Sequence, residues 1–199
     1  MQTEEASVTA VMHEDRIAYH RITVDQYYRM AEVGVLAPDE RVELIDGVII
    51  DMAPIGSRHA GTSSQLGELL LNALGTRAIL RGQSPIRFGG SSEPQPDLAV
   101  LRRRNDYYKT AHPSAEDTLL IVEVSDTSAR YDLQVKVPLY ARYRIPEVWV
   151  VDLAQDLMRV HRKPEGGTYA DISAFAEPGV ITLAALPDIT VDLTGLLRG

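Results

Sequence analysis

The feature that most limits the fold of this chain is a nearly unbroken apolar segment, Thr118–Val124, whose single charge is Glu123 near its end. A strand made almost wholly of apolar residues is typical of the centre of a sheet that is covered on both faces. A helix is predicted next, around Arg130–Tyr143, and a second apolar strand, Glu147–Asp152, follows it. This order of elements predicts a mixed α/β domain.

The rest of the chain adds elements on both sides of this centre. Thr23 and Gln26 form a capping box that predicts a short helix ending at Gly34. The segment from Arg41 to Asp46 alternates like a half-buried strand, and Asp46-Gly47 turns it into a hairpin. Further elements are predicted as follows: a helix over Ser57–Leu74, two short strands within Arg77–Phe88, strands at Asp97–Leu101 and Leu157–Arg162, and more strands in the last 30 residues. We expect residues 1–20 to be a flexible leader and residues 21–199 to be one domain.

Composition excludes several classes of protein. The chain has 199 residues, of which 45% are hydrophobic and 24% charged, as in an ordinary soluble domain. It has no apolar run of about 18 residues and no signal-peptide pattern at its N-terminus, so we expect no membrane span and a cytoplasmic location. With no cysteine, it has no disulfide, thiol nucleophile or cysteine-bound zinc.

The net charge of −8 argues against a dedicated nucleic-acid-binding domain. The charge is uneven, however, because the middle of the chain contains the run Arg102, Arg103 and Arg104. These arginines are candidates for contacts with substrate phosphates, although a solvated set of surface arginines explains them equally well.

Three carboxylates lie on three predicted strands. Asp97 begins one strand, Glu123 closes another, and Glu43 lies within Val42–Ile45. An isolated charge in an apolar strand is costly unless it has a partner or a metal. If the three meet in one cleft, their oxygen atoms suit Mg²⁺ or Mn²⁺. Gln95, two residues before Asp97, is a further candidate at this cleft or simply a polar loop residue.

The order of these motifs resembles the Uma family of restriction endonucleases, which have a restriction-endonuclease-like fold and belong to the PD-(D/E)xK nuclease superfamily. The resemblance covers about residues 20–195, and its motifs here are Val42–Gly47, His59, Pro96–Val100, Ile121–Ser125, Tyr131–Ala141 and Ile145–Asp152. It implies a mixed β-sheet flanked by helices, with an N-terminal helix and extra β-hairpins.

The resemblance also implies roles for individual residues. Glu43, Asp97 and Glu123 would bind the divalent cation, but Ser125 stands where the superfamily has its lysine. A lysine on the following helix, Lys136 here, replaces it in the Uma family. Pro138 puts the position of Lys136 in question, because proline kinks the interior of a helix.

The remaining interpretations stay open at this point. His59 matches a histidine of the family that contacts a phosphate or a carboxylate, or it is only a hydrogen-bonding group at a helix terminus. Asp132 lies four residues before Lys136, so the two could simply form a salt bridge on the helix.

Three functions agree with these observations. The leading prediction is a metal-dependent endonuclease acting on nucleic acid, DNA in the first place, as a homodimer that cuts both strands. The first alternative is a nucleic-acid-binding module with a nuclease-like fold and weak or no activity. The second is a hydrolase that uses Asp97 and Glu123 on a sugar, which the single tryptophan and two phenylalanines disfavour.

Overall fold

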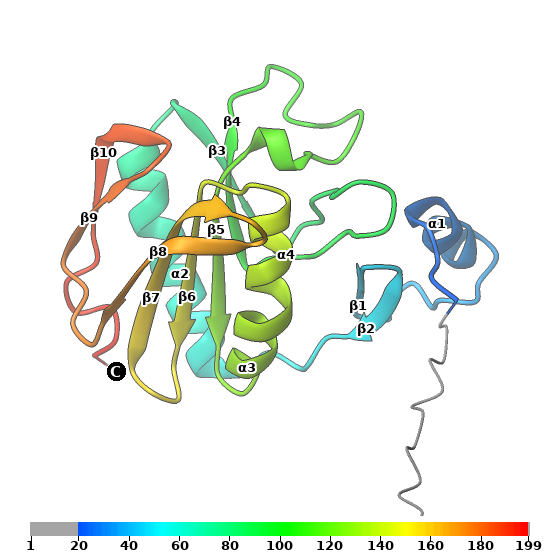
Figure 1. Ribbon diagram of the computed structural model, residues 1–199, viewed down its shortest axis with the longest axis horizontal. Helices are drawn as coiled ribbons and strands as arrows, with labels where there is room; N and C mark the ends of the chain where they lie inside the picture. Colours follow the sequence, from blue (N-terminus) through cyan, green and yellow to red (C-terminus); the bar gives the residue numbers. More distant parts are fainter. Residues whose placement is uncertain (1–19, 199) are drawn as a thin grey trace, which may run out of the picture.

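A computed structural model describes residues 20–198, and all of the predicted leader except His20 lies outside them. Its centre is a six-stranded sheet in the order β3-β4-β5-β6-β7-β8 (Figure 1). The bounds are Ala78–Gly82 for β3, Leu98–Arg102 for β4, Thr118–Ser125 for β5, Glu147–Asp152 for β6, Leu157–Glu165 for β7 and Thr168–Phe175 for β8. Only β5 and β6 pair in parallel. The mixed α/β fold predicted from the sequence is confirmed.

Helices cover the two faces of this sheet (Figure 1). Helix α2 (Ser57–Leu74) packs on one face, where Leu66 and Leu70 share a core with Trp149. The connection between β5 and β6 covers the other face and consists of α3 (Ala129–Tyr131), a π-helical turn η2 (Asp132–Lys136) and α4 (Val137–Arg142). All eight residues of β5 are buried, as its apolar sequence predicts.

Two small hairpins and an N-terminal helix complete the fold. Strands β9 (Val180–Leu183) and β10 (Leu186–Asp192) pair with each other near α2, and a short helix η1 (Ala115–Asp117) precedes β5. Helix α1 (Val24–Glu32) begins with the predicted capping box. Strands β1 (Val42–Ile45) and β2 (Val48–Asp51) form the predicted hairpin, which lies with α1 to one side of the main sheet (Figure 1).

Two predictions about strands are wrong. Strand β1 is fully buried rather than half-buried, because the loop before β4 covers it and bonds it through a bridge between Leu44 and Glu93. Arg77–Phe88 forms one strand, β3, and only isolated bridges at Arg87 and Phe88 instead of a second strand, because the chain leaves the sheet after Gly82 and enters a loop that contains Pro85. Within residues 20–198, no helix combines the length and apolar character that crossing a membrane requires.

Candidate active site

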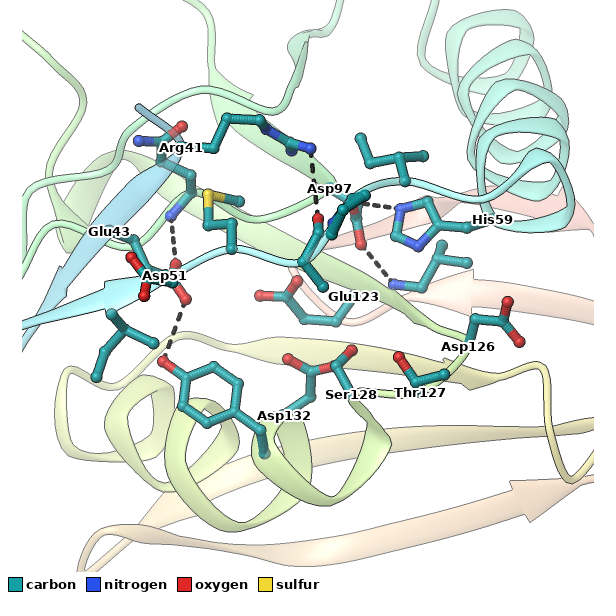
Figure 2. A pocket seen from close by; sticks show the side chains of 18 of the residues that line it. Arg41, Glu43, Asp51, His59, Asp97, Glu123, Asp126, Thr127, Ser128 and Asp132 are labelled. Atoms are coloured by element: carbon teal, nitrogen blue, oxygen red, sulfur yellow. Dashed lines mark hydrogen bonds and ion pairs between the residues drawn. The ribbon is translucent and has the colours of Figure 1, made fainter. Parts of the chain in front are cut away.

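A pocket of about 540 Å³ opens where β4 begins and β5 ends (Figure 2). The hairpin β1–β2, the segment Met52–Gly56, the start of α2 and the η2 turn form its other walls. The pocket brings together the predicted site residues Glu43, His59, Gln95, Asp97, Glu123 and Lys136. The three carboxylates predicted on separate strands therefore converge on one cleft.

The sheet register places Asp97 beside Glu123. Strands β4 and β5 are antiparallel with Leu98 opposite Val122, so the next position sets Asp97 opposite Glu123. Side chains at opposite positions of neighbouring strands lie on the same face, about 5 Å apart at their Cβ atoms. The pairing of two central strands thus creates the carboxylate pair.

Asp97 is held from two sides. Its Oδ1 lies 2.8 Å from Nε2 of His59, and its Oδ2 accepts a hydrogen bond of 2.8 Å from the amide of Val124 (Figure 2). The hydrogen bond to Asp97 raises the pKa of His59, although partial burial of the ring works against it. Of the two interpretations of His59, the contact with a carboxylate is the one present here.

Glu123 is 3% exposed and lies at the centre of the pocket (Figure 2). Its Oε1 accepts a hydrogen bond from the hydroxyl of Tyr140, and Nζ of Lys136 lies 3.3 Å away. Burial raises the pKa of Glu123, and the charge of Lys136 opposes this shift. Both of these contacts are made with Oε1 of Glu123, a residue that lines the pocket.

Lys136 reaches the cleft in spite of Pro138. Its Nζ lies 3.2 Å from Oε2 of Glu43 and 3.3 Å from Oε1 of Glu123, and the residue is 4% exposed. Burial alone would lower the pKa of Lys136, but the Glu123 and Glu43 carboxylates raise it, so the ammonium is charged.

A change of helical period before the proline explains how this is possible. Residues Asp132–Lys136 form the π-helical turn η2, and Pro138 sits in the first turn of α4, where its missing N–H is tolerated. Asp132 accepts hydrogen bonds from Ser125 (2.6 Å) and Ser128 (2.8 Å). Within residues 20–198, the ion pairs of Lys136 are those with Glu43 and Glu123, so the alternative of a helix salt bridge with Asp132 is wrong.

Glu43 uses both of its oxygens in contacts with the protein. Oε1 accepts a hydrogen bond of 3.1 Å from Tyr131, and Oε2 accepts one of 3.0 Å from the amide of Gln95. The side chain of Gln95 donates to the carbonyl of Val42 and so fastens β1 to the loop before β4. Gln95 thus lines the pocket, but its side-chain amide is hydrogen-bonded to the backbone.

The three arginines predicted to contact substrate do not line this pocket. Arg102 ends β4, five residues from Asp97, which is about 17 Å along an extended strand. Arg103 lies over the ring of Tyr107, and Arg104 pairs with Asp106 at 2.7 Å. A role in binding nucleic acid at this distance from the pocket stays a prediction.

Sequence reasoning missed several residues that line or support the pocket, among them Arg41, Tyr131 and Tyr140. Arg41 lines the pocket, and the alternation of β1 could have revealed it, because residues two apart on a strand share a face and Glu43 was already a candidate. Tyr131 and Tyr140 hold Glu43 and Glu123, respectively. Tyr131 ends α3 and Tyr140 lies in α4, on either side of the π-helical turn, for which the sequence pattern carries no signal.

The donor set agrees with a hard divalent cation. Mg²⁺ keeps several waters and is usually bound by one or two carboxylates together with substrate phosphate oxygens. Asp97 and Glu123 provide such a pair. Within residues 20–198, no three His, Asp or Glu side chains are grouped so that they could hold a metal by themselves.

Comparisons with known proteins agree with this geometry. The model of the Uma2 family, described as "Putative restriction endonuclease", matches residues 24–194. A crystal structure of a protein from Anabaena variabilis, described as "a putative nuclease belonging to DUF820", superposes with a TM-score of 0.67 at 14% identity. The match covers 88% of this chain and 97% of the other, which shows a shared fold. No curated protein matches the sequence.

Proposed function

Because the chain belongs to the Uma2 family and has a nuclease fold, we propose that it is a divalent-metal-dependent endonuclease that hydrolyses phosphodiester bonds of DNA in the cytoplasm. The observation that carries this proposal is the meeting of Asp97, Glu123 and Lys136 in one pocket, two carboxylates beside a buried ammonium. A charged phosphate can enter such a site only if cations balance the carboxylates.

Asp97 and Glu123 would hold Mg²⁺ or Mn²⁺. When bound, the metal activates water and stabilises charge on the reacting phosphate. His59 and the amide of Val124 each bind one oxygen of Asp97 and so fix the orientation of its carboxylate. In this proposal His59 is a positioning residue.

Lys136 would supply the positive charge that the strand lysine supplies in the superfamily. It would orient the attacking water or stabilise the negative charge that develops on the phosphate oxygens. Glu43 would aid by holding Lys136 in place, because its Oε2 lies 3.2 Å from Nζ of Lys136. Its role as a metal ligand stays a prediction, and its contacts favour this supporting role.

A binding module with weak or no activity is the second candidate. Lys136 is held between two carboxylates, and such an ion pair must loosen before the ammonium can act on a substrate. A homodimer is part of the leading proposal, because two-fold symmetry suits the cutting of both strands of a duplex. Sedimentation of the full chain tests that assembly.

The experiment that tests the proposal measures metal binding and cleavage together. We expect the protein to nick plasmid DNA with Mg²⁺ or Mn²⁺ and to bind Mn²⁺ in calorimetry. Asp97→Ala should lose both properties, because it removes half of the carboxylate pair. Asp188→Ala, which removes an exposed carboxylate paired with Arg77, is the control and should change neither.

The outcomes separate the candidates. Mn²⁺ binding without cleavage would favour the binding module. Unchanged Mn²⁺ affinity in both Asp97→Ala and Glu123→Gln would show that the metal site lies elsewhere.

A further inference from the structure

A second cavity, of about 780 Å³, lies between helix α2 and strand β3. Strand β3 is at the edge of the six-stranded sheet, so nothing within that sheet covers its outer side. One stripe of α2 forms the opposite wall, with residues three and four positions apart from Ala60 through Ser64 and Gly67 to Leu71. We call this cavity the edge groove.

The edge groove adjoins the candidate active site. Asp97 and Ile55 line both cavities. Gly82, at the end of β3, faces Leu98, and a Cβ added to it would lie 3.6 Å from the carbonyl oxygen of Asp97. A molecule that places a phosphate at Asp97 therefore lies at the border of the groove.

The chemistry of the edge groove differs from that of the active site. Apart from Asp97, its lining has one charged residue, Glu68, and no basic residue. Leu71 is 55% exposed and, with Leu80 and Ile55, offers apolar surface. Asn72 and Gln83 add uncharged hydrogen-bonding groups. Such a lining offers apolar contacts and uncharged hydrogen-bonding groups to a sugar and a base, and it lacks the cations that would bind the phosphates of a duplex.

From these shared lining residues and the chemistry of the lining we infer that the edge groove is a subsite for the nucleotide next to the scissile phosphate, which it binds unpaired from its complementary strand. The inference rests on the proposed nuclease function for the place of the scissile phosphate. An unpaired base can bury its apolar face against the aliphatic wall, whereas a base in a duplex is stacked and paired already.

Gly67 is the position at which this subsite can be closed without disturbing the fold. A Cβ added there would lie 3.9 Å from a methyl group of Leu98, which is an ordinary van der Waals contact. A leucine at this position would extend into the groove, and replacing a glycine inside a helix favours the helix. Gly61 lies on the same helix but lines neither cavity, and a Cβ there would meet nothing within 4 Å.

The experiment compares the full-length parent with Gly67→Leu and with Gly61→Leu as the matched control. A fluorescent single-stranded DNA of about 12 nucleotides and its blunt duplex are the binding probes. Hydrolysis of bis(4-nitrophenyl) phosphate with Mn²⁺ reports on the active site without any flanking nucleotide. The Tm of each variant checks its folding, and Gly67→Gln repeats the test with an unbranched side chain.

We expect Gly67→Leu to weaken binding of the single strand at least about ten-fold, which is about 1.4 kcal/mol. Hydrolysis of the small diester should stay within about two-fold of the parent, because that substrate does not enter the groove. An equal loss of affinity for the duplex and the single strand would contradict the binding of an unpaired nucleotide. An equal loss of affinity in Gly61→Leu would show that the effect comes from a change in helix α2 and not from closing the groove.

The subsite and the nuclease function fail separately. If the parent cleaves DNA and Gly67→Leu binds the single strand as the parent does, the subsite is wrong and the function stands. If the parent hydrolyses neither substrate but its binding of the single strand depends on Gly67, the nuclease function is wrong, and the groove binds a nucleotide without a scissile phosphate beside it. A parent that binds no single strand overturns the subsite.

Discussion

At the scale of the residue, Lys136 balances the charge of two buried carboxylates. Its ammonium group lies between Glu43 and Glu123 in surroundings that leave the residue 4% exposed. Removing one partner from a buried ionic group leaves the others without compensation, which typically destabilises a protein by about 3–5 kcal/mol. Lys136 therefore supports the folded state of the site as well as its proposed chemistry.

We predict that Lys136→Met lowers phosphodiester hydrolysis by roughly 10²–10⁴, the usual share of a positioned acid–base or charge-stabilising group. In metal-free buffer it should also lower the free energy of unfolding by about 3 kcal/mol, measured with urea. Mn²⁺ binding should remain, because Asp97 and Glu123 are intact.

Two further variants sharpen this prediction. Ser125→Lys in the Lys136→Met background should restore part of the activity, since residue 125 lies two positions after Glu123 on the same strand. Lys163→Met removes an exposed lysine paired with Asp171 and should behave as the parent does. Full activity in Lys136→Met would show that the lysine is only structural.

At the scale of the element, the hairpin β1–β2 carries Glu43 to the pocket, and its turn is closely packed. Gly47 has φ of +75°, and its amide donates to the carbonyl of Ser91. A Cβ at this position would lie 2.7 Å from Cβ of Arg21 and 2.9 Å from the carbonyl oxygen of Ile22. Only glycine satisfies both the backbone conformation and the packing.

Gly47→Ala should therefore destabilise the protein more than Gly34→Ala does. Gly34 has a similar φ of +76° but no atom within 4 Å of an added Cβ, so it isolates the conformational cost of about 1 kcal/mol. The steric conflict at Gly47 should add about 1–3 kcal/mol. Urea unfolding of both variants measures the difference. Equal losses in the free energy of unfolding would mean that the turn rearranges to accept the Cβ without a steric penalty.

At the scale of the whole molecule, one buried histidine links the stability of the sheet to pH. His161 on β7 is 4% exposed, and within residues 20–198 neither of its ring nitrogens has a hydrogen-bond partner. Its ring meets that of Tyr169 edge-on at 5.7 Å. Burial, with a smaller contribution from Arg159, lowers the pKa of His161 from 6.5 to about 4. The folded protein thus holds this imidazole neutral.

The sign of the resulting pH dependence follows from proton binding. Between pH 6.5 and about 4 the unfolded chain binds a proton at His161 and the folded chain does not, so stability falls as the pH falls. Above pH 6.5, His161 is neutral in both states and does not lower the free energy of unfolding. Near pH 4, keeping it neutral in the folded protein lowers the free energy of unfolding by about 2–3 kcal/mol. Urea unfolding of the parent and His161→Phe at several pH values isolates it, because other titrating groups cancel in the difference. A constant difference between the two proteins across this range would refute the assignment.

Much of the fold is determined by local patterns in the sequence. The capping box at Thr23 and Gln26 starts α1, and the apolar run of β5 makes a central strand, because each depends on residues that are neighbours in the chain. The three carboxylates of the site were likewise predicted as members of one cleft, since a charge in an apolar strand needs a charged partner or a bound metal. The order of these motifs also indicated the family.

Only the tertiary structure decided how the site is assembled. Glu43 meets Tyr131 across 88 positions of sequence, and the loop before β4 buries β1 completely. The π-helical turn before Pro138 sets Lys136 toward Glu43 and Glu123 instead of Asp132. These contacts join segments that are distant in the chain, and their energies depend on burial that exists only once the sheet, the hairpin and the helix have packed together.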